Sequence, residues 1–244
     1  MRRHENLPLN IFLFLRYYII DTIIMSKSQA RQTRFSKLWN PIMLALVFFI
    51  TFVVSLFPAS WHEILYSVSI TLLFITAVLT MSKRRGLILI LVGIAVGMEW
   101  LSSILSLAIP DAISKVLNFC FFAFMVGYYI NLIAIAEKVT PKVIFQAIIG
   151  YLLLGLVYSI LIGLVIEINP AMFNIPVLQD AGNPAHFSEY LYFGFVTFTT
   201  LGYGDIFPVL PFARSLSILI SVSGQLYLAI IIALLVGKYS SQRK

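Results

Sequence analysis

The sequence has few charged residues and a single cysteine. Charged residues make up 11% of the 244-residue chain, whereas hydrophobic residues make up 60%. A soluble globular domain is usually about 25% charged and about 45–50% apolar, so a single soluble core cannot account for this composition. The lone Cys120 excludes an intrachain disulfide and a cysteine metal cluster. Because Cys120 lies within an apolar run, we expect its side chain to be buried.

The residue patterns of enzymes and of nucleic-acid-binding proteins are also missing. The three histidines, His4, His62 and His186, are expected to lie in different loops or termini, and no paired acids or metal-spaced set falls within the apolar stretches. The net charge is +7, but the lysines and arginines form short clusters between long apolar stretches, not one basic face. We therefore expect neither an enzyme, nor a bound cofactor, nor a nucleic-acid partner.

Long apolar stretches dominate the rest of the chain. A spanning helix needs roughly 20 mostly apolar residues, and five stretches meet this length while a sixth is slightly short. We therefore predict an all-α membrane protein with six transmembrane helices. The six stretches are Pro41–Phe57, Ile64–Thr80, Gly86–Ile109, Ala112–Ala136, Ile144–Ile166 and Phe212–Val236.

The loops between these stretches alternate in charge, which predicts their orientation. One set of loops, together with the C-terminus, is rich in lysine and arginine, whereas the alternate loops contain neither. Cytoplasmic loops are enriched in these residues, so we expect both termini in the cytoplasm of a multi-pass protein of the cell membrane. The basic residues are Lys27, Arg31, Arg34, Lys37, Lys83, Arg84, Arg85, Lys138, Lys142, Lys238, Arg243 and Lys244.

The first 25 residues allow three interpretations. Leu9–Met25 is apolar, but Arg16 and Asp21 interrupt it, and each is costly at bilayer depth. The segment lacks the unbroken apolar region and small-residue cleavage site of a signal peptide. It is an interfacial helix, a seventh span, or a segment upstream of a translation start at Met25.

A segment of different composition, Asn169–Pro208, lies between the fifth and sixth stretches. It is polar at first, then aromatic, and then rich in threonine and glycine. Its run Thr200-Leu201-Gly202-Tyr203-Gly204-Asp205 resembles the selectivity filter of the potassium channels, which reads Thr-Val-Gly-Tyr-Gly and is usually followed by Asp. The position of this run between two apolar stretches, after an aromatic helical segment, makes the resemblance specific.

The resemblance implies a site for dehydrated potassium ions. Rings of backbone carbonyls replace the water that the ion loses. The oxygens would be the carbonyls of Thr200, Leu201, Gly202 and Tyr203, together with the Thr200 hydroxyl. Successive carbonyls can face one axis only if backbone conformations alternate, some with positive φ. We therefore expect positive φ at Gly202 and Gly204, because glycine adopts it without steric cost.

The same resemblance places a short re-entrant pore helix at about Phe187–Thr199, before the filter. Its carboxyl end would carry about half a negative charge, which favours a cation. The ring of Tyr203 would point away from the ion and pack against pore-helix aromatics, for which Tyr192 and Phe193 are suitably placed.

The outer side of the filter differs from the common family pattern. Many members place a glutamate in the pore helix, bonded to the aspartate after the filter, whereas this chain has Val196 there. We expect Asp205 to lose that partner, which affects the stability of the outer mouth but not selectivity. Thr199, at the end of the pore helix, is expected to support the filter.

Glycines mark further positions in the fifth and sixth stretches. Pro208–Lys238 resembles the inner helix of small bacterial channels of the ion-channel family, and Gly224 lies where many members have a hinge glycine. Gly224 serves either as a hinge or as a site of close helix packing. Gly150, Gly155 and Gly163 are most simply packing positions.

The layout predicts three regions. Residues 1–40 form a cytoplasmic or interfacial segment, 41–136 a peripheral four-helix domain, and 137–244 the pore domain. The fourth stretch, Ala112–Ala136, has no arginine and a single Lys115, so it lacks the charges that steep voltage gating needs.

Together these features predict a potassium-selective channel subunit that assembles as a homotetramer in the lipid bilayer, because one pore loop per chain requires four chains. A nonselective cation channel and a potassium transporter subunit are the alternatives. Retention of Tyr203 disfavours the first, and a single loop with two glycines disfavours the second. The gating stimulus stays open, and Glu99 within the third stretch is either functional or simply hydrogen-bonded.

Overall fold

The computed structural model describes residues 39–80, 92–97, 100, 108–175 and 187–242. Three features of the sequence therefore lie outside the described residues: the first 25 residues with Met25, the carboxylate of Glu99, and most of the predicted third span, Gly86–Ile109.

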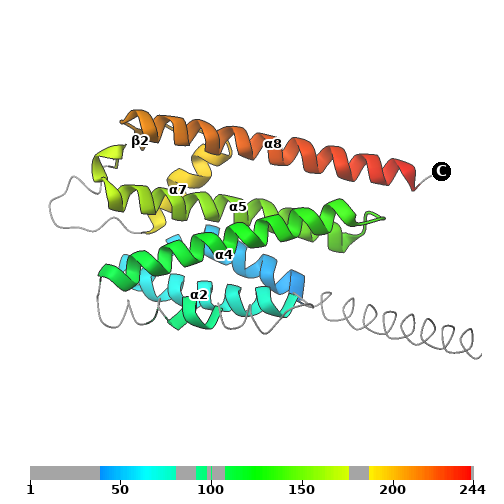
Figure 1. Cartoon of the computed structure of the whole chain (residues 1–244), viewed down its shortest axis with the longest axis horizontal. Helices are drawn as coiled ribbons and strands as arrows, with labels where there is room; N and C mark the ends of the chain where they lie inside the picture. Colours follow the sequence, from blue (N-terminus) through cyan, green and yellow to red (C-terminus); the bar gives the residue numbers. More distant parts are fainter. Residues whose placement is uncertain (1–38, 81–91, 98–99, 101–107, 176–186, 243–244) are drawn as a thin grey trace, which may run out of the picture.

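The described chain is essentially all-helical. Five helices are long and apolar enough to cross a membrane, and they run side by side along the long axis of the molecule (Figure 1). A short helix, α7 (Phe187–Phe198), lies between two of them, α5 and α8. The five long helices are Trp39–Leu56, α2 (Ala59–Thr80), α4 (Ala108–Ile135), α5 (Pro141–Ile168) and α8 (Pro211–Ser241).

The helices agree with five of the predicted stretches, but most extend further. The sixth predicted stretch ended at Val236, whereas α8 continues through Lys238 to Ser241. The apolar stretch ends where polar residues begin, but backbone hydrogen bonding continues past that point. The first helix closes with a π-helical turn, Phe49–Val53, and a 3₁₀ turn, Val54–Leu56.

One core joins Trp39–Leu56, α2, α4 and α5. The rings of Phe74 and Phe122 stack at 5.3 Å between α2 and α4, and the buried Tyr129 hydroxyl contacts the Met43 sulfur at 3.0 Å. The prediction of a buried Cys120 was wrong, because its side chain is exposed. In a helix that faces lipid, an apolar residue can lie on the outer face as readily as in the core.

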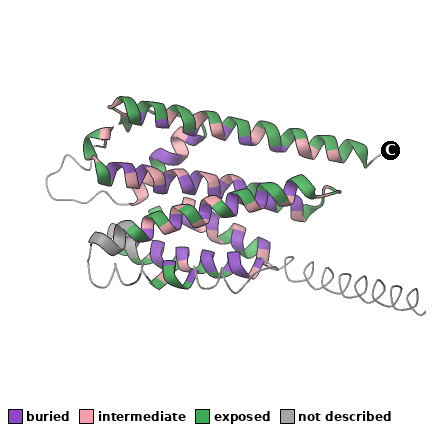
Figure 2. Cartoon of the chain, viewed as in Figure 1, coloured by how far each residue is buried: buried purple, intermediate pink, exposed green. Residues whose placement is uncertain are grey.

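Helix α5 is largely buried, whereas α8 exposes most of its length (Figure 2). Three glycines of α5 each lie so close to an aromatic side chain that an added Cβ would come within 3 Å of one of its atoms, which confirms the predicted packing role. Each pair joins α7 or α8 to α5. The pairs are Gly150 with Tyr227, Gly155 with Phe195, and Gly163 with Tyr190.

Lysine side chains join α4 to its neighbours at both of its ends. Near the start of α4, the Lys115 ammonium lies 3.0 Å from the Glu167 carboxylate at the end of α5. At the carboxyl end of α4, the Lys238 ammonium of α8 donates three hydrogen bonds of 2.7 Å to main-chain carbonyls. The acceptors are the carbonyls of Ile133, Ala134 and Ala136.

A two-residue antiparallel ladder joins the segments on either side of α7. Strand β1 (Phe173–Asn174) pairs with β2 (Phe207–Pro208), and the Val209 amide donates to the Met172 carbonyl at 2.9 Å. This ladder was not predicted, because two-residue strands have no detectable sequence pattern. It ties the segment that follows α5 to the segment that precedes α8.

Candidate functional site

The candidate site is the loop that follows α7. Helix α7 ends at Phe198, one residue before the predicted end, and the Thr199 amide still bonds to the Phe195 carbonyl at 2.9 Å. The Thr199 hydroxyl donates to the same carbonyl at 2.7 Å. Thr199 therefore closes the helix through both its amide and its hydroxyl.

The main chain beyond Thr199 turns back on the end of α7. The amides of Leu201 and Gly202 both donate to the Val196 carbonyl, at 2.9 and 3.3 Å. The peptide bonds are trans, so the N–H and C=O of each peptide unit point in opposite directions. The carbonyls of Thr200 and Leu201 therefore point away from α7.

The loop alternates in backbone conformation as predicted. Gly202 has φ 59° and Gly204 has φ 84°, in the left-handed region that glycine tolerates. Thr200 has φ 61°, a conformation that is rare for a β-branched residue and was not predicted. Every second residue from Thr200 to Gly204 is thus left-handed, a repeat that turns successive carbonyls toward a common side.

The loop is open in a single chain. All residues from Thr199 to Asp205 are exposed, with 56% of Leu201 and 68% of Tyr203 accessible. Within the part of the chain that the structure describes, the outward-facing carbonyls of this loop are therefore accessible to solvent, an ion or another chain.

Tyr192 and Asp205 join α7 to the end of the loop. The Tyr192 hydroxyl donates a hydrogen bond of 2.6 Å to Oδ2 of Asp205. This bond lowers the pKa of the Asp205 carboxyl and raises the pKa of Tyr192 to about 12. Asp205 therefore has a partner on α7, Tyr192, which lies one helical turn before Val196.

The other predicted supporting aromatic lies elsewhere. The buried ring of Phe193 packs edge-on against Phe173 of β1 at 5.2 Å. The described ring contacts thus connect Phe193 to the ladder next to the loop, while the ring of Tyr203 stays accessible.

Helix α8 contacts both the end of α7 and the loop. The Ser221 hydroxyl donates to the Thr197 carbonyl at 2.9 Å, and the Gln225 amide lies 3.4 Å from the Thr200 hydroxyl. Between them, a Cβ added to Gly224 would lie 2.2 Å from the Phe198 carbonyl oxygen. The geometry thus gives Gly224 a packing role, and α8 is one continuous helix through this position. The polar residues Ser221 and Gln225 flank Gly224 in sequence, but only the fold brings them to the loop.

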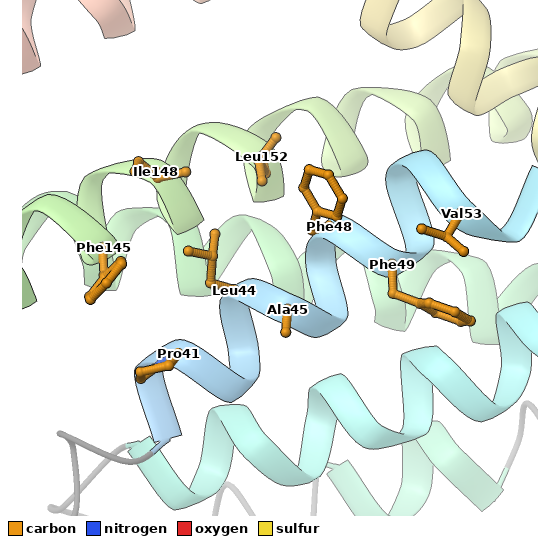
Figure 3. Close-up of a pocket in the computed structure, with 9 residues that line it drawn as sticks. All are labelled: Pro41, Leu44, Ala45, Phe48, Phe49, Val53, Phe145, Ile148 and Leu152. Atoms are coloured by element: carbon orange, nitrogen blue, oxygen red, sulfur yellow. The ribbon is translucent and has the colours of Figure 1, made fainter.

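A groove elsewhere in the described chain lacks polar side chains that could bind an ion. An apolar groove of about 450 Å³ lies between the first helix and α5, and all the side chains that line it are carbon-only (Figure 3). Within the described ranges, no three His, Cys, Asp or Glu side chains gather to bind a metal ion. The groove is lined by Pro41, Leu44, Ala45, Phe48, Phe49, Val53, Phe145, Ile148 and Leu152.

Residues 147–240 match a protein-family model described as an ion channel. This range contains α7, the loop, α8 and most of α5. A search of curated proteins and a search of solved structures gave no match.

Proposed function

We infer from the ion-channel domain at residues 147–240 that this membrane protein is a subunit of a potassium-selective channel. The observation that supports this most directly is the loop backbone, in which the Thr200 and Leu201 carbonyls point away from α7 and left-handed residues alternate. Backbone carbonyls in such a file can replace the hydration shell of a potassium ion.

The proposed ligands are the carbonyls of Thr200, Leu201, Gly202 and Tyr203, with the hydroxyl of Thr200 at the inner end. Gly204 completes the turn toward Asp205. Potassium is the permeant ion, and no resident cofactor is needed.

Four copies of the chain are proposed to surround one axis. One loop supplies only a quarter of each oxygen ring, and the exposure of Thr199–Asp205 in one chain fits a site that neighbours complete. The broad exposed apolar surface of α8 fits burial against further copies and lipid. The exposed ring of Tyr203 would then find its packing partners across the interface.

The proposed membrane layout has six spans, with α7 and the loop re-entering from the outer side. Non-helical backbone at membrane depth is tolerated where it lines a cavity, which fits a pore loop. Lys238 lies next to the end of α4, and Lys138 and Lys142 follow that end in sequence, so one side of the molecule is basic. By the positive-inside rule this side is cytoplasmic, as are both termini, in a multi-pass protein of the cell membrane.

The chain is proposed to divide into three regions. Residues 137–244 form the pore domain, residues 41–136 a peripheral domain, and residues 1–40 a cytoplasmic or interfacial segment. Without arginines in α4, opening is proposed to depend little on voltage.

Ion flux from reconstituted liposomes tests the proposal. Purified full-length chain should pass potassium far faster than sodium, barium should block the flux, and the particle mass should be that of four chains. Equal sodium and potassium fluxes would indicate a nonselective channel. Uphill potassium accumulation coupled to another gradient would indicate a transporter.

A further inference from the structure

A small polar cavity lies at the end of the helix bundle where the peripheral helices meet α5. Its volume is about 30 Å³, and residues of four helices line it: the first helix, α2, α4 and α5. It lies outside the α7 loop and has no part in the proposed conduction path. The lining residues are Asn40, Thr80, Tyr128, Tyr129, Leu132, Lys142 and Gln146.

Asn40 has buried polar atoms that nothing else in the described chain satisfies. Its side chain is 1% exposed, and neither its amide nitrogen nor its amide oxygen has a hydrogen-bond partner. Buried amides are almost always paired, because an unpaired one loses its hydration without compensation. Gln146, which is 4% exposed, adds a second buried amide to the same cavity. The cavity is thus built for a polar occupant.

The charge of the cavity indicates the sign of that occupant. Lys142 is half-buried, and none of the described residues that line the cavity is a carboxylate. Lys142 is also the second residue of α5, where the helix dipole is positive and disfavours a cation. The Thr140 side chain makes no capping bond there. A negative occupant would offset both the ammonium charge and the positive end of the helix.

We propose that this cavity binds a single small anion the size of chloride. Its volume suits one water-sized species, which excludes a phosphate or carboxylate group enclosed within it. The Lys142 ammonium and the Asn40 amide N–H would donate to the anion from opposite sides, α5 and the first helix. Binding would therefore strengthen the joint between the peripheral domain and the pore domain.

Halide substitution tests the site directly. The full-length protein is crystallised in potassium bromide, and anomalous scattering from bromine is measured at the bromine absorption edge. The expected result is one bromide peak between Asn40 and Lys142. A cavity that holds only water, with no anomalous peak, overturns the proposal.

Two variants and one control give a solution readout. Lys142→Met keeps the length of the side chain but removes its charge, and Asn40→Leu removes the amide at nearly constant volume. Charge-assisted hydrogen bonds are among the stronger ones, so each change should weaken halide binding by about ten- to a hundredfold. Lys138→Met changes net charge equally at an exposed residue that does not line the cavity.

The measurement is the melting temperature of each full-length protein in potassium chloride against potassium gluconate at equal ionic strength. Chloride should stabilise the wild-type protein and Lys138→Met, but not Lys142→Met or Asn40→Leu. A chloride effect of equal size in all four proteins would show general salt stabilisation and overturn the proposal. If either variant fails to fold, the wild-type bromide map decides alone. Neither readout depends on potassium conduction, so this inference and the proposed function can fail separately.

Discussion

The Tyr192 hydroxyl lies 2.6 Å from Oδ2 of Asp205, so one hydrogen bond joins the middle of α7 to the residue that follows the candidate filter. The resemblance to the potassium channels implies a pore-helix glutamate as the partner of this aspartate, and this chain has Val196 at that position. The tyrosine supplies the partner that Asp205 was expected to lack.

Replacing this tyrosine should make the outer mouth more sensitive to acid. The bond lowers the pKa of Asp205, so the bonded carboxylate form persists at neutral pH and is lost as pH falls through that lowered value. Tyr192→Phe removes the donor, and the pKa of Asp205 should rise toward its ordinary value. Single-channel recording with the external pH lowered stepwise should show acid inhibition beginning at a higher pH in the variant. Tyr190→Phe is the matched control, because the ring of Tyr190 packs against Gly163 and the side chain that lowers the pKa of Asp205 is Tyr192.

The two roles considered for Gly224 predict different results for Gly224→Ala. The added Cβ would lie 2.2 Å from the Phe198 carbonyl oxygen, so α7 or α8 must shift, at a cost of about 1–3 kcal/mol for an overpacked site. The melting temperature should therefore fall and conductance should be lost. Gly237→Ala, on the same helix with no atom within 4 Å of the added Cβ, should leave both unchanged. A stable variant with altered open probability alone would favour the hinge.

Alanine at the left-handed glycines should distort the loop without a steric clash inside one chain. Gly202 and Gly204 have no atom within 4 Å of an added Cβ, but positive φ costs a residue with a Cβ about 1–2 kcal/mol. Each substitution should abolish selective potassium flux from liposomes while the five long helices stay folded by circular dichroism. Gly127→Ala, in an open position of α4 without positive φ, should conduct normally. Full selective flux in Gly202→Ala would contradict the proposed filter.

Removing the Lys238 ammonium should loosen the carboxyl end of α8. Its three hydrogen bonds of 2.7 Å reach the carbonyl end of α4, where the helix dipole also favours a cation. Lys238→Met keeps the apolar stem and should lose about 1–3 kcal/mol of stability, seen as a lower melting temperature. Lys138→Met serves as the exposed control. An unchanged melting temperature for Lys238→Met would mean that water replaces these bonds at no cost.

The conductance of the wild-type channel should vary little with voltage. Moving one charge through 100 mV supplies about 2.3 kcal/mol, so steep gating needs several moving charges. Helix α4 has no arginine, and its Lys115 pairs with Glu167 of α5 at 3.0 Å. Conductance–voltage curves in planar bilayers, measured from about −100 to about +100 mV, should be shallow. A steep sigmoidal curve would show that charges elsewhere move.

Local backbone features of the site could be predicted from the sequence, because they depend on residue type and on neighbours along the chain. Left-handed conformations at Gly202 and Gly204 follow from the absence of a Cβ. The five long helices could be predicted from the length of the apolar stretches. Their polar ends, such as the last turn of α8, could not. Thr200 could not be predicted in the same way, because its residue type disfavours φ 61° and the surrounding fold must hold it there.

The exposure of Cys120 shows a second limit. An apolar run predicts membrane depth, but in a lipid-facing helix hydropathy does not separate the core face from the outer face. Which side of α4 faces its neighbours depends on how its side chains interlock with α2 and α5.

The sequence alone determined where this chain is apolar, where its charges cluster, and where its glycines permit a filter-like backbone. Only the tertiary structure decided that Tyr192 reaches Asp205, that Gly224 touches Phe198, and that Lys238 contacts α4. These partners are 13, 26 and at least 104 residues apart in the chain. Residue type and local pattern carry no information on such distances, because packing of whole helices brings the groups together.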